Sequence, residues 1–107
     1  MKKMIKLVAL HKRPSSMTVE EYRSFWLGSH ADIGKRWPGI KKYKISFDVS
    51  PVDEKHICDS MAELYFDSLE DLIIAWASPE HQEGMKHLAD YNIQVIGKTW
   101  VEENVII

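Results

Sequence analysis

The 107-residue sequence has a single cysteine, Cys58, which excludes an internal disulfide, and no paired cysteine spacing indicates a zinc ribbon. Long hydrophobic runs are absent as well. The longest, Leu72 to Ala77, is far shorter than the roughly 18 residues that a membrane span needs. The apolar stretch from Leu7 to Leu10 is too short for a signal peptide. These absences predict a soluble cytoplasmic protein with no membrane partner.

An excess of basic charge is also lacking. The net charge is −2 and the pI is near 6.2, and the basic residues are scattered among acidic ones. Affinity for nucleic acid depends mainly on basic contacts to phosphates, so the sequence excludes a nucleic-acid partner. The densest basic stretch, within residues 35–44, is interrupted by Trp37-Pro38-Gly39 and is interpreted as a solvated strand edge.

Motifs for cofactors and nucleophiles are missing too. The sequence has no His-Glu-x-x-His motif, no phosphate-binding loop and no glycine-rich dinucleotide turn. No serine or cysteine stands in a nucleophile elbow, and Cys58 has no basic neighbour except His56. We therefore predict no cofactor and no metal site, although His11, His30 and Glu63 could converge in space to hold a metal.

The patterns that are present predict six elements in the order strand, helix, strand, strand, helix, strand. Thr18 and Glu21 form a capping box that begins the first helix, and Pro38-Gly39 stops it. The order predicts one α+β domain over residues 1–107, with a four-stranded antiparallel sheet and both helices on one face. The predicted strands are 4–12, 40–49, 61–66 and 98–105, the helices are 18–35 and 68–91 with a restart at Ser78-Pro79, and 50–55 is a polar connection.

Both faces of the predicted sheet are largely apolar. The first strand places Leu7 and Ala9 on one side and Val8 and Leu10 on the other, whereas a one-sided sheet alternates apolar with polar residues. The helices cover one face. The economical cover for the other is the same face of a second copy, so the sequence predicts a homodimer through the sheet.

Several stretches resemble the EthD family of dimeric α/β-barrel, ferredoxin-like domains. They are 5–10, 18–31, 38–43, 59–68 and 77–80. The resemblance implies a βαββαβ ferredoxin-like fold, two sheets face to face in a dimeric barrel, and a pocket in each subunit between sheet and helices. The family commonly has glycine where Ser60 stands, a departure expected to stiffen a turn. Relatives include cofactor-free lactone isomerases and polyketide cyclases or decarboxylases, and other members have no assigned activity.

Two histidines are the first candidates for chemistry. His30 follows Trp26 by one helical turn, so its ring points toward the sheet, and a partly buried imidazole is suited to move protons. The resemblance implies that a histidine at this position lines the pocket. His11 ends the first strand on the side of Leu7, from which it could approach His30. The alternative for both is a structural histidine. The other histidines, His56, His81 and His87, are given no role.

Glu63 is the third predicted catalytic residue, because a carboxylate in a central strand must be paired, protonated or at the dimer seam. It either pairs with Lys6 on the neighbouring strand or complements His30. A flat substrate would stack well on aromatic side chains. The predicted substrate-binding residues, each also open to a plain core role, are Trp26, Tyr22, Ile33, Trp37, Tyr65 and Trp76.

These residues predict that the protein encloses a small organic ligand. We expect a cofactor-free isomerase, cyclase or decarboxylase with a role in catabolism, which uses His30 as acid or base on a small lactone, phenol or polyketide-like substrate. The first alternative is a non-catalytic binding or accessory protein for a hydrophobic small molecule. The second is haem degradation, for which Trp76 and His87 lie in the right helix region but the first strand lacks the asparagine that such relatives use.

Overall fold

The sheet is built around strand β1 (Lys3–Lys12), which lies between β3 and β4. In the computed structural model, which describes residues 3–51 and 55–107, the strand order is β2-β3-β1-β4 and every pair is antiparallel. Strand β1 pairs with β4 from Lys3, opposite Asn104, to Lys12, opposite Gln94, and this pairing has an irregularity between Leu10 and His11. The other elements are α1 (Val19–Leu27), α2 (Ser29–Gly34), β2 (Lys42–Phe47), β3 (Ser60–Phe66), α3 (Leu69–Trp76), α4 (Pro79–Asp90) and β4 (Gln94–Asn104).

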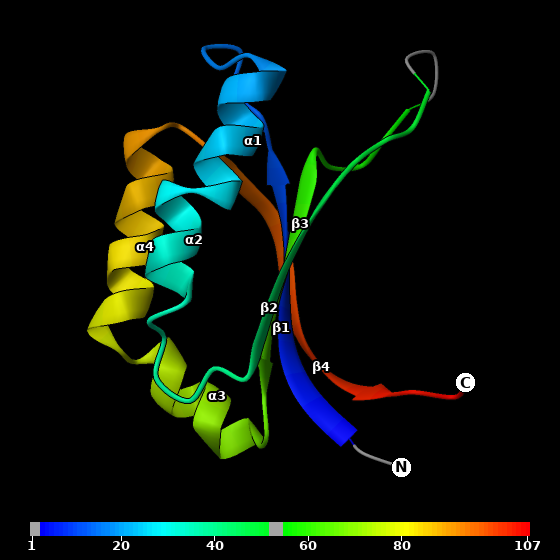
Figure 1. The fold of residues 1–107 in the computed structure, drawn as a ribbon, viewed down its shortest axis with the longest axis vertical. Coiled ribbons are helices and arrows are strands. Elements are labelled where there is room, and N and C mark those ends of the chain that lie inside the picture. Colours follow the sequence, from blue (N-terminus) through cyan, green and yellow to red (C-terminus); the bar gives the residue numbers. More distant parts are fainter. Residues whose placement is uncertain (1–2, 52–54) are drawn as a thin grey trace.

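All four helices lie on one face of the sheet (Figure 1). The α+β, ferredoxin-like prediction is therefore confirmed, with shifted boundaries. The last strand begins at Gln94 rather than residue 98, and the second is shorter than predicted, at 42–47. The polar connection predicted at 50–55 lies partly outside the described residues. No helix among the described residues is long and apolar enough to cross a membrane.

The helix predicted over 18–35 is two helices. Backbone dihedral angles at Gly28 of φ −114° and ψ −101° end α1 and begin α2. The apolar spacing continues across the break, and for this reason the sequence pattern did not reveal it. The break matters for the site because it places His30 on a separate short helix that packs against α4.

The capping box at the start of α1 is present as predicted. The Thr18 hydroxyl accepts from the backbone N–H of Glu21, and the Glu21 carboxylate accepts from the backbone N–H of Thr18. We expect Thr18→Ala to lower the free energy of unfolding by about 1 kcal/mol in urea titrations, because one backbone donor loses its partner. Ser15→Ala, in the exposed turn before the helix, is the control and should leave stability unchanged. An equal effect of the two variants would contradict this role of Thr18.

The helix-facing side of the sheet forms the core. Leu7, Leu64 and Phe66 are buried there beneath Leu72 and Ala75 of α3. Phe25 and Trp26 of α1 pack onto the same cluster, and Trp26 is only 1% exposed. The large aromatic rings within this core leave little free space between α1, α2 and the sheet.

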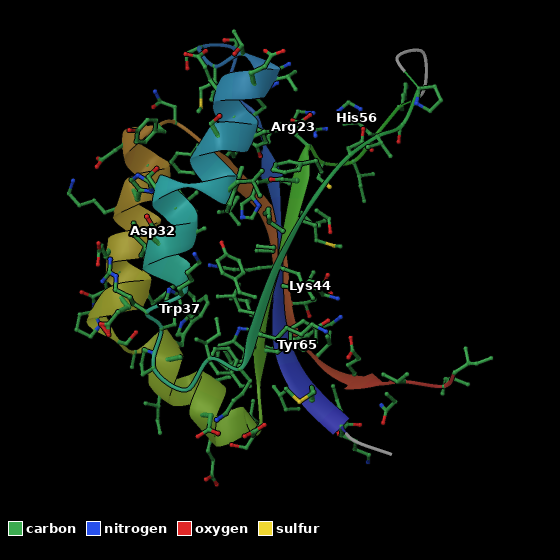
Figure 2. The ribbon with its side chains drawn as sticks, in the orientation of Figure 1. Arg23, Asp32, Trp37, Lys44, His56 and Tyr65 are labelled. Atoms are coloured by element: carbon green, nitrogen blue, oxygen red, sulfur yellow. The ribbon has the colours of Figure 1, made fainter. Side chains whose placement is uncertain are left out.

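The opposite face carries an ionic network among apolar residues. Lys6 Nζ lies 2.5 Å from Glu63 Oε2 and 2.9 Å from Glu103 Oε2, and Lys44 lies 3.7 Å from Glu63 Oε1. The Tyr65 hydroxyl donates to Glu103 at 2.9 Å. Figure 2 shows Lys44 and Tyr65 on the side of the sheet away from the helices. The predicted pairing of Glu63 with Lys6 is therefore present.

Candidate functional site

His30 is the second residue of α2, and its side chain is 7% exposed. The short helix packs on α4 near Gly84, where a Cβ atom would lie 3.8 Å from His30 Cε1. One turn further along α4, His87 turns its ring toward α2. The Nδ1 atoms of His30 and His87 are 3.0 Å apart, and the two ring planes are within 4° of parallel.

A hydrogen bond between two Nδ1 atoms requires that one of them carries a proton and the other does not. The ring of Phe25 stacks on both imidazoles, at 5.1 Å from His30 and 4.6 Å from His87. Burial, together with the nearby imidazoles of His87 and His11, lowers the pKa of His30 to about 4. Burial also lowers the pKa of His87. At neutral pH both imidazoles are therefore uncharged, and each ring keeps one unprotonated nitrogen.

His11 lies at the end of β1 on the same side of the sheet, and burial lowers its pKa to about 4. Its Nδ1 is 3.3 Å from Ser60 Oγ, which is 2.6 Å from the Tyr22 hydroxyl. These contacts fix the orientation of the His11 ring. Ser60 is thus a buried hydrogen-bonding residue at the start of β3, and not only a residue that stiffens a turn.

Trp26 connects the two histidines. Its ring centroid lies 4.3 Å from that of His11 and 4.8 Å from that of His30. All three residues line an inner cavity of about 40 Å³. The other lining residues are Leu7, Ala9, Gly34, Trp37, Tyr43, Ala62, Leu64, Met85 and Leu88. The cavity has room for a few water molecules only, whereas ligand pockets usually span about 300–1,000 Å³.

Two of the predicted substrate-binding residues, Trp26 and Trp37, line this cavity. Tyr22 lies behind it, bonded to Ser60, and Ile33 is buried near Gly84 of α4. Trp76 is elsewhere: it stacks on His81 at 4.0 Å and contacts the edge of Trp100. The helical face of Trp76 therefore does not look onto the cavity.

The prediction that Glu63 complements His30 is wrong for a single chain. Side chains alternate along β3, so Glu63 and Tyr65 lie on the open face while Leu64 faces the helices. The same alternation removes Tyr65 from the cavity wall. It also prevents His11, His30 and Glu63 from converging, and no cluster of metal-ligating residues exists among the described residues.

The sequence interpretation missed the contact of His87 with His30 and gave His87 no role beside it. The signal available was the position of His87 one turn after Gly84, the small residue where α4 approaches α2. His81 is also buried. Its Nδ1 is 2.8 Å from the carbonyl oxygen of Trp76, so Nδ1 carries the proton. It therefore holds the junction of α3 and α4 and does not line the cavity.

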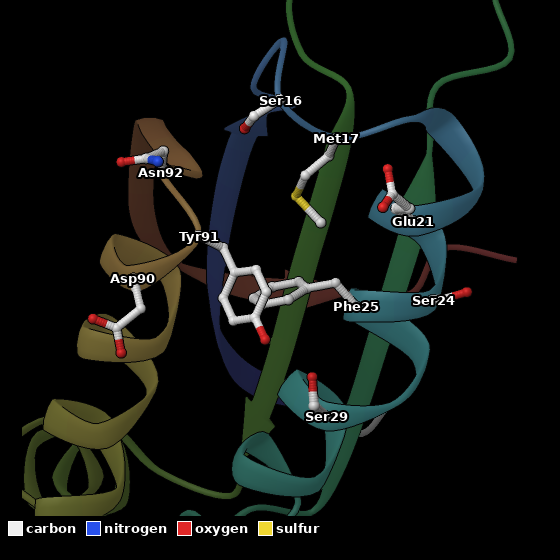
Figure 3. A pocket seen from close by; sticks show the side chains of 9 residues that line it. All are labelled: Ser16, Met17, Glu21, Ser24, Phe25, Ser29, Asp90, Tyr91 and Asn92. Atoms are coloured by element: carbon white, nitrogen blue, oxygen red, sulfur yellow. The ribbon is translucent and has the colours of Figure 1, made fainter.

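Two larger hollows border this region. A groove of about 570 Å³ lies between α1 and the end of α4, and the rings of Phe25 and Tyr91, which line it, contact each other with centroids 4.9 Å apart (Figure 3). It also carries the carboxylates of Glu21 and Asp90. A second groove, of about 320 Å³, is lined by Trp26, Leu27, Ala31, Lys35, Tyr43 and Ile45. Trp26 and Tyr43 line both this second groove and the inner cavity.

Residues 14–91 match the EthD domain model. Among solved structures, an EthD family protein from Bacillus halodurans is 21% identical, with 96% of this chain and 99% of that one covered and a TM-score of 0.73. A dimeric ferredoxin-like protein of unknown function from Thermobifida fusca is 13% identical, with 98% and 93% covered and a TM-score of 0.67. The hydroxynitrile lyase from Passiflora edulis is 15% identical, with 95% and 92% covered and a TM-score of 0.66. No curated protein sequence matches the chain.

Proposed function

The chain belongs to the EthD family, and on this basis we propose that it binds a small organic molecule beside His30 and catalyses proton transfer on it without a cofactor. The observation that carries the proposal is the hydrogen bond of 3.0 Å between His87 and His30, which lines the small inner cavity. The reaction class is isomerisation, cyclisation or decarboxylation of a lactone, phenol or polyketide-like acid.

The chemistry follows from the tautomers of the pair. When His30 carries its proton on Nδ1 and donates it to His87, the lone pair on His30 Nε2 is free to act as a base. Uptake of a proton from an acidic carbon or phenol turns His30 into an imidazolium. The hydrogen bond from its Nδ1 to neutral His87 stabilises that cation. The substrate anion that forms beside His30 stabilises it further. Return of the proton to another substrate atom completes an isomerisation.

His11 is the assisting residue in this proposal. Its ring lies on the other side of Trp26 and is oriented by Ser60, so a second acid or base stands within the same cavity wall. Glu63 is not part of the mechanism. The Passiflora protein, named a hydroxynitrile lyase, supports the idea that this fold can house catalysis without indicating the substrate of this chain.

The proposal includes a homodimer through the open sheet face. That face presents Val8, Leu10 and Met61 around the network of Lys6 and Glu63. The Thermobifida protein of the same fold is described as dimeric. The dimer would remove the half-exposed apolar residues from water, and sedimentation analysis of the purified protein tests it.

His30→Gln is expected to abolish turnover while it preserves binding, because glutamine keeps polar atoms in place but cannot take up a proton. A thermal-shift screen against small aromatic acids, lactones and haem would first identify ligands, and each ligand would then be followed for conversion. The loss of rate should be 100-fold or more, the lower end of general acid–base effects. His56→Gln, outside the cavity, is the matched control and should retain full activity.

The screen also separates the alternatives. Ligands that bind wild type and His30→Gln equally, and that neither protein converts, would contradict catalysis and leave a binding or accessory protein. A Soret band on mixing with haem would instead favour haem chemistry.

A further inference from the structure

The inner cavity and the 320 Å³ groove share two of their lining residues. Trp26 and Tyr43 line both spaces, the cavity on the side of His30 and the groove on the side of Leu27 and Lys35. The groove lies where α1 and α2 pass over strand β2, one of the two edge strands of the sheet. Joined, the two spaces reach the lower end of the size range of small-molecule sites.

The two wall residues differ in how firmly they are held. Trp26 is 1% exposed and its ring contacts those of Tyr22, Phe25, His11 and His30. It therefore cannot move without disturbing the core.

Tyr43 is only half-buried, and it comes from an edge strand. Its ring lies directly against Gly34, where a Cβ atom would collide with Cε2. Burial raises the pKa of Tyr43 to about 12, and no hydrogen bond to a described residue contributes to that shift. The ring is thus held by packing alone, and rotation about its side-chain bonds breaks no polar contact.

The groove also indicates what kind of ligand it takes. Its lining residues are apolar apart from the Tyr43 hydroxyl, the Trp26 indole N–H and one charged residue, Lys35. Lys35 has a weak partner in Asp32, at 3.9 Å, and both side chains are largely exposed. An ammonium at the mouth of an apolar groove favours an anionic group on an apolar body.

We propose that the groove and the inner cavity form one binding site for a small carboxylate, with its carboxylate at Lys35, its apolar body against Leu27 and Ile45, and its far end admitted to His30 by displacement of Tyr43. The statement that the ligand reacts at the end next to His30 rests on the proposed function. The binding geometry itself does not.

The groove of Figure 3 is the alternative route by which a ligand could reach the two histidines. Its lining residues Phe25 and Tyr91 both contact the ring of His87. The charged residues of its lining are Glu21 and Asp90, and Asp90 is already paired with Lys86 at 2.8 Å, so the lining offers an anion no cationic partner. The charges of the two grooves therefore favour the Tyr43 side for an acid. The two routes make opposite predictions for substitutions at Tyr43 and Tyr91.

The test uses benzoate and its neutral counterpart benzamide as probes, followed through tryptophan fluorescence in stopped flow and through the indole N–H resonances. Trp26 is a direct reporter, because its buried indole N–H has no partner among the described residues. Tyr43→Ala should raise the association rate of both probes at least tenfold. Tyr91→Ala should leave it unchanged. Tyr43→Leu serves as a second variant with a better-filled wall.

Lys35→Met should weaken benzoate binding about fivefold and leave benzamide unaffected, with Lys12→Met as the matched control. Faster association in Tyr91→Ala but not in the Tyr43 variants would overturn the route. Absence of any Trp26 shift in wild type and both Tyr43 variants would overturn the site. Equal weakening of both probes by Lys35→Met would overturn the carboxylate assignment. None of these readouts requires turnover, so they test the binding site separately from the catalytic role of His30.

Discussion

A change from pH 8 to pH 5 is expected to lower the free energy of unfolding by about 4 kcal/mol through His11 and His30 alone. Both imidazoles have a pKa of about 4 in the fold, against about 6.5 in an unfolded chain. Between these values the unfolded chain binds more protons than the folded one. Stability is therefore full above pH 6.5 and is lost as the pH falls toward 4, by about 2 kcal/mol for each imidazole at pH 5.

Urea titrations at pH 8, 6.5, 5.8 and 5 measure this loss. The series stops at pH 5 because Glu63 and Glu103, whose pKa values are lowered by Lys6, contribute their own loss only at more acidic pH. His11→Gln or His30→Gln should each remove about 2 kcal/mol of the loss, and His56→Gln, at an exposed position, is the control. A loss below 1 kcal/mol in the wild-type protein would mean that neither imidazole is held neutral by the fold.

Lys6→Met is expected to destabilise the protein by about 3 kcal/mol at pH 7, because it leaves the largely buried carboxylate of Glu63 without its main partner. Lys6 contacts both Glu63 and Glu103, and its side chain is only 15% exposed. Lys44 is a poor substitute, since its ammonium lies 3.7 Å from Glu63 and is 43% exposed. Urea titrations of both proteins at the same protein concentration measure this change in the free energy of unfolding.

The double substitution of Lys6→Met with Glu63→Gln should recover much of that loss, because no uncompensated carboxylate remains in the strand. Lys44→Met is the matched control and should cost less than 1 kcal/mol, as expected for an exposed ion pair. If Lys6→Met and Lys44→Met had equal effects, burial of the network would not be what makes Lys6 important.

The fold was accessible from the sequence because its signals are local. The Thr18 and Glu21 capping box begins a helix in any context, and alternation along β1 and β3 assigns residues to faces. The break at Gly28 was not accessible, since the apolar spacing continues through it from Trp26 to His30. Only the packing of α2 on α4 requires the chain to turn there.

The site was accessible in part. His30 was identified because its spacing from Trp26 turns it toward the sheet, and His11 because it shares a side with Leu7. His87 was missed because its partner lies 57 positions away in the sequence, on another helix. The misplacement of Tyr65 has a different cause. Its alternation with Leu64 already assigned it to the open face, but its aromatic character was given more weight.

The pairing of Lys3 with Asn104 has a consequence for how the chain folds. The β2–β3 hairpin joins neighbours such as Phe47 and Ser60, so it can form early. The β1–β4 ladder instead closes a loop of nearly the whole chain, and such contacts slow folding because the entropy of closure is lost before the contacts stabilise the product. During that interval the edge of β1 that later receives β4 is unpaired and able to template intermolecular strands. The strand order therefore predicts slow refolding, and aggregation during refolding that increases with protein concentration.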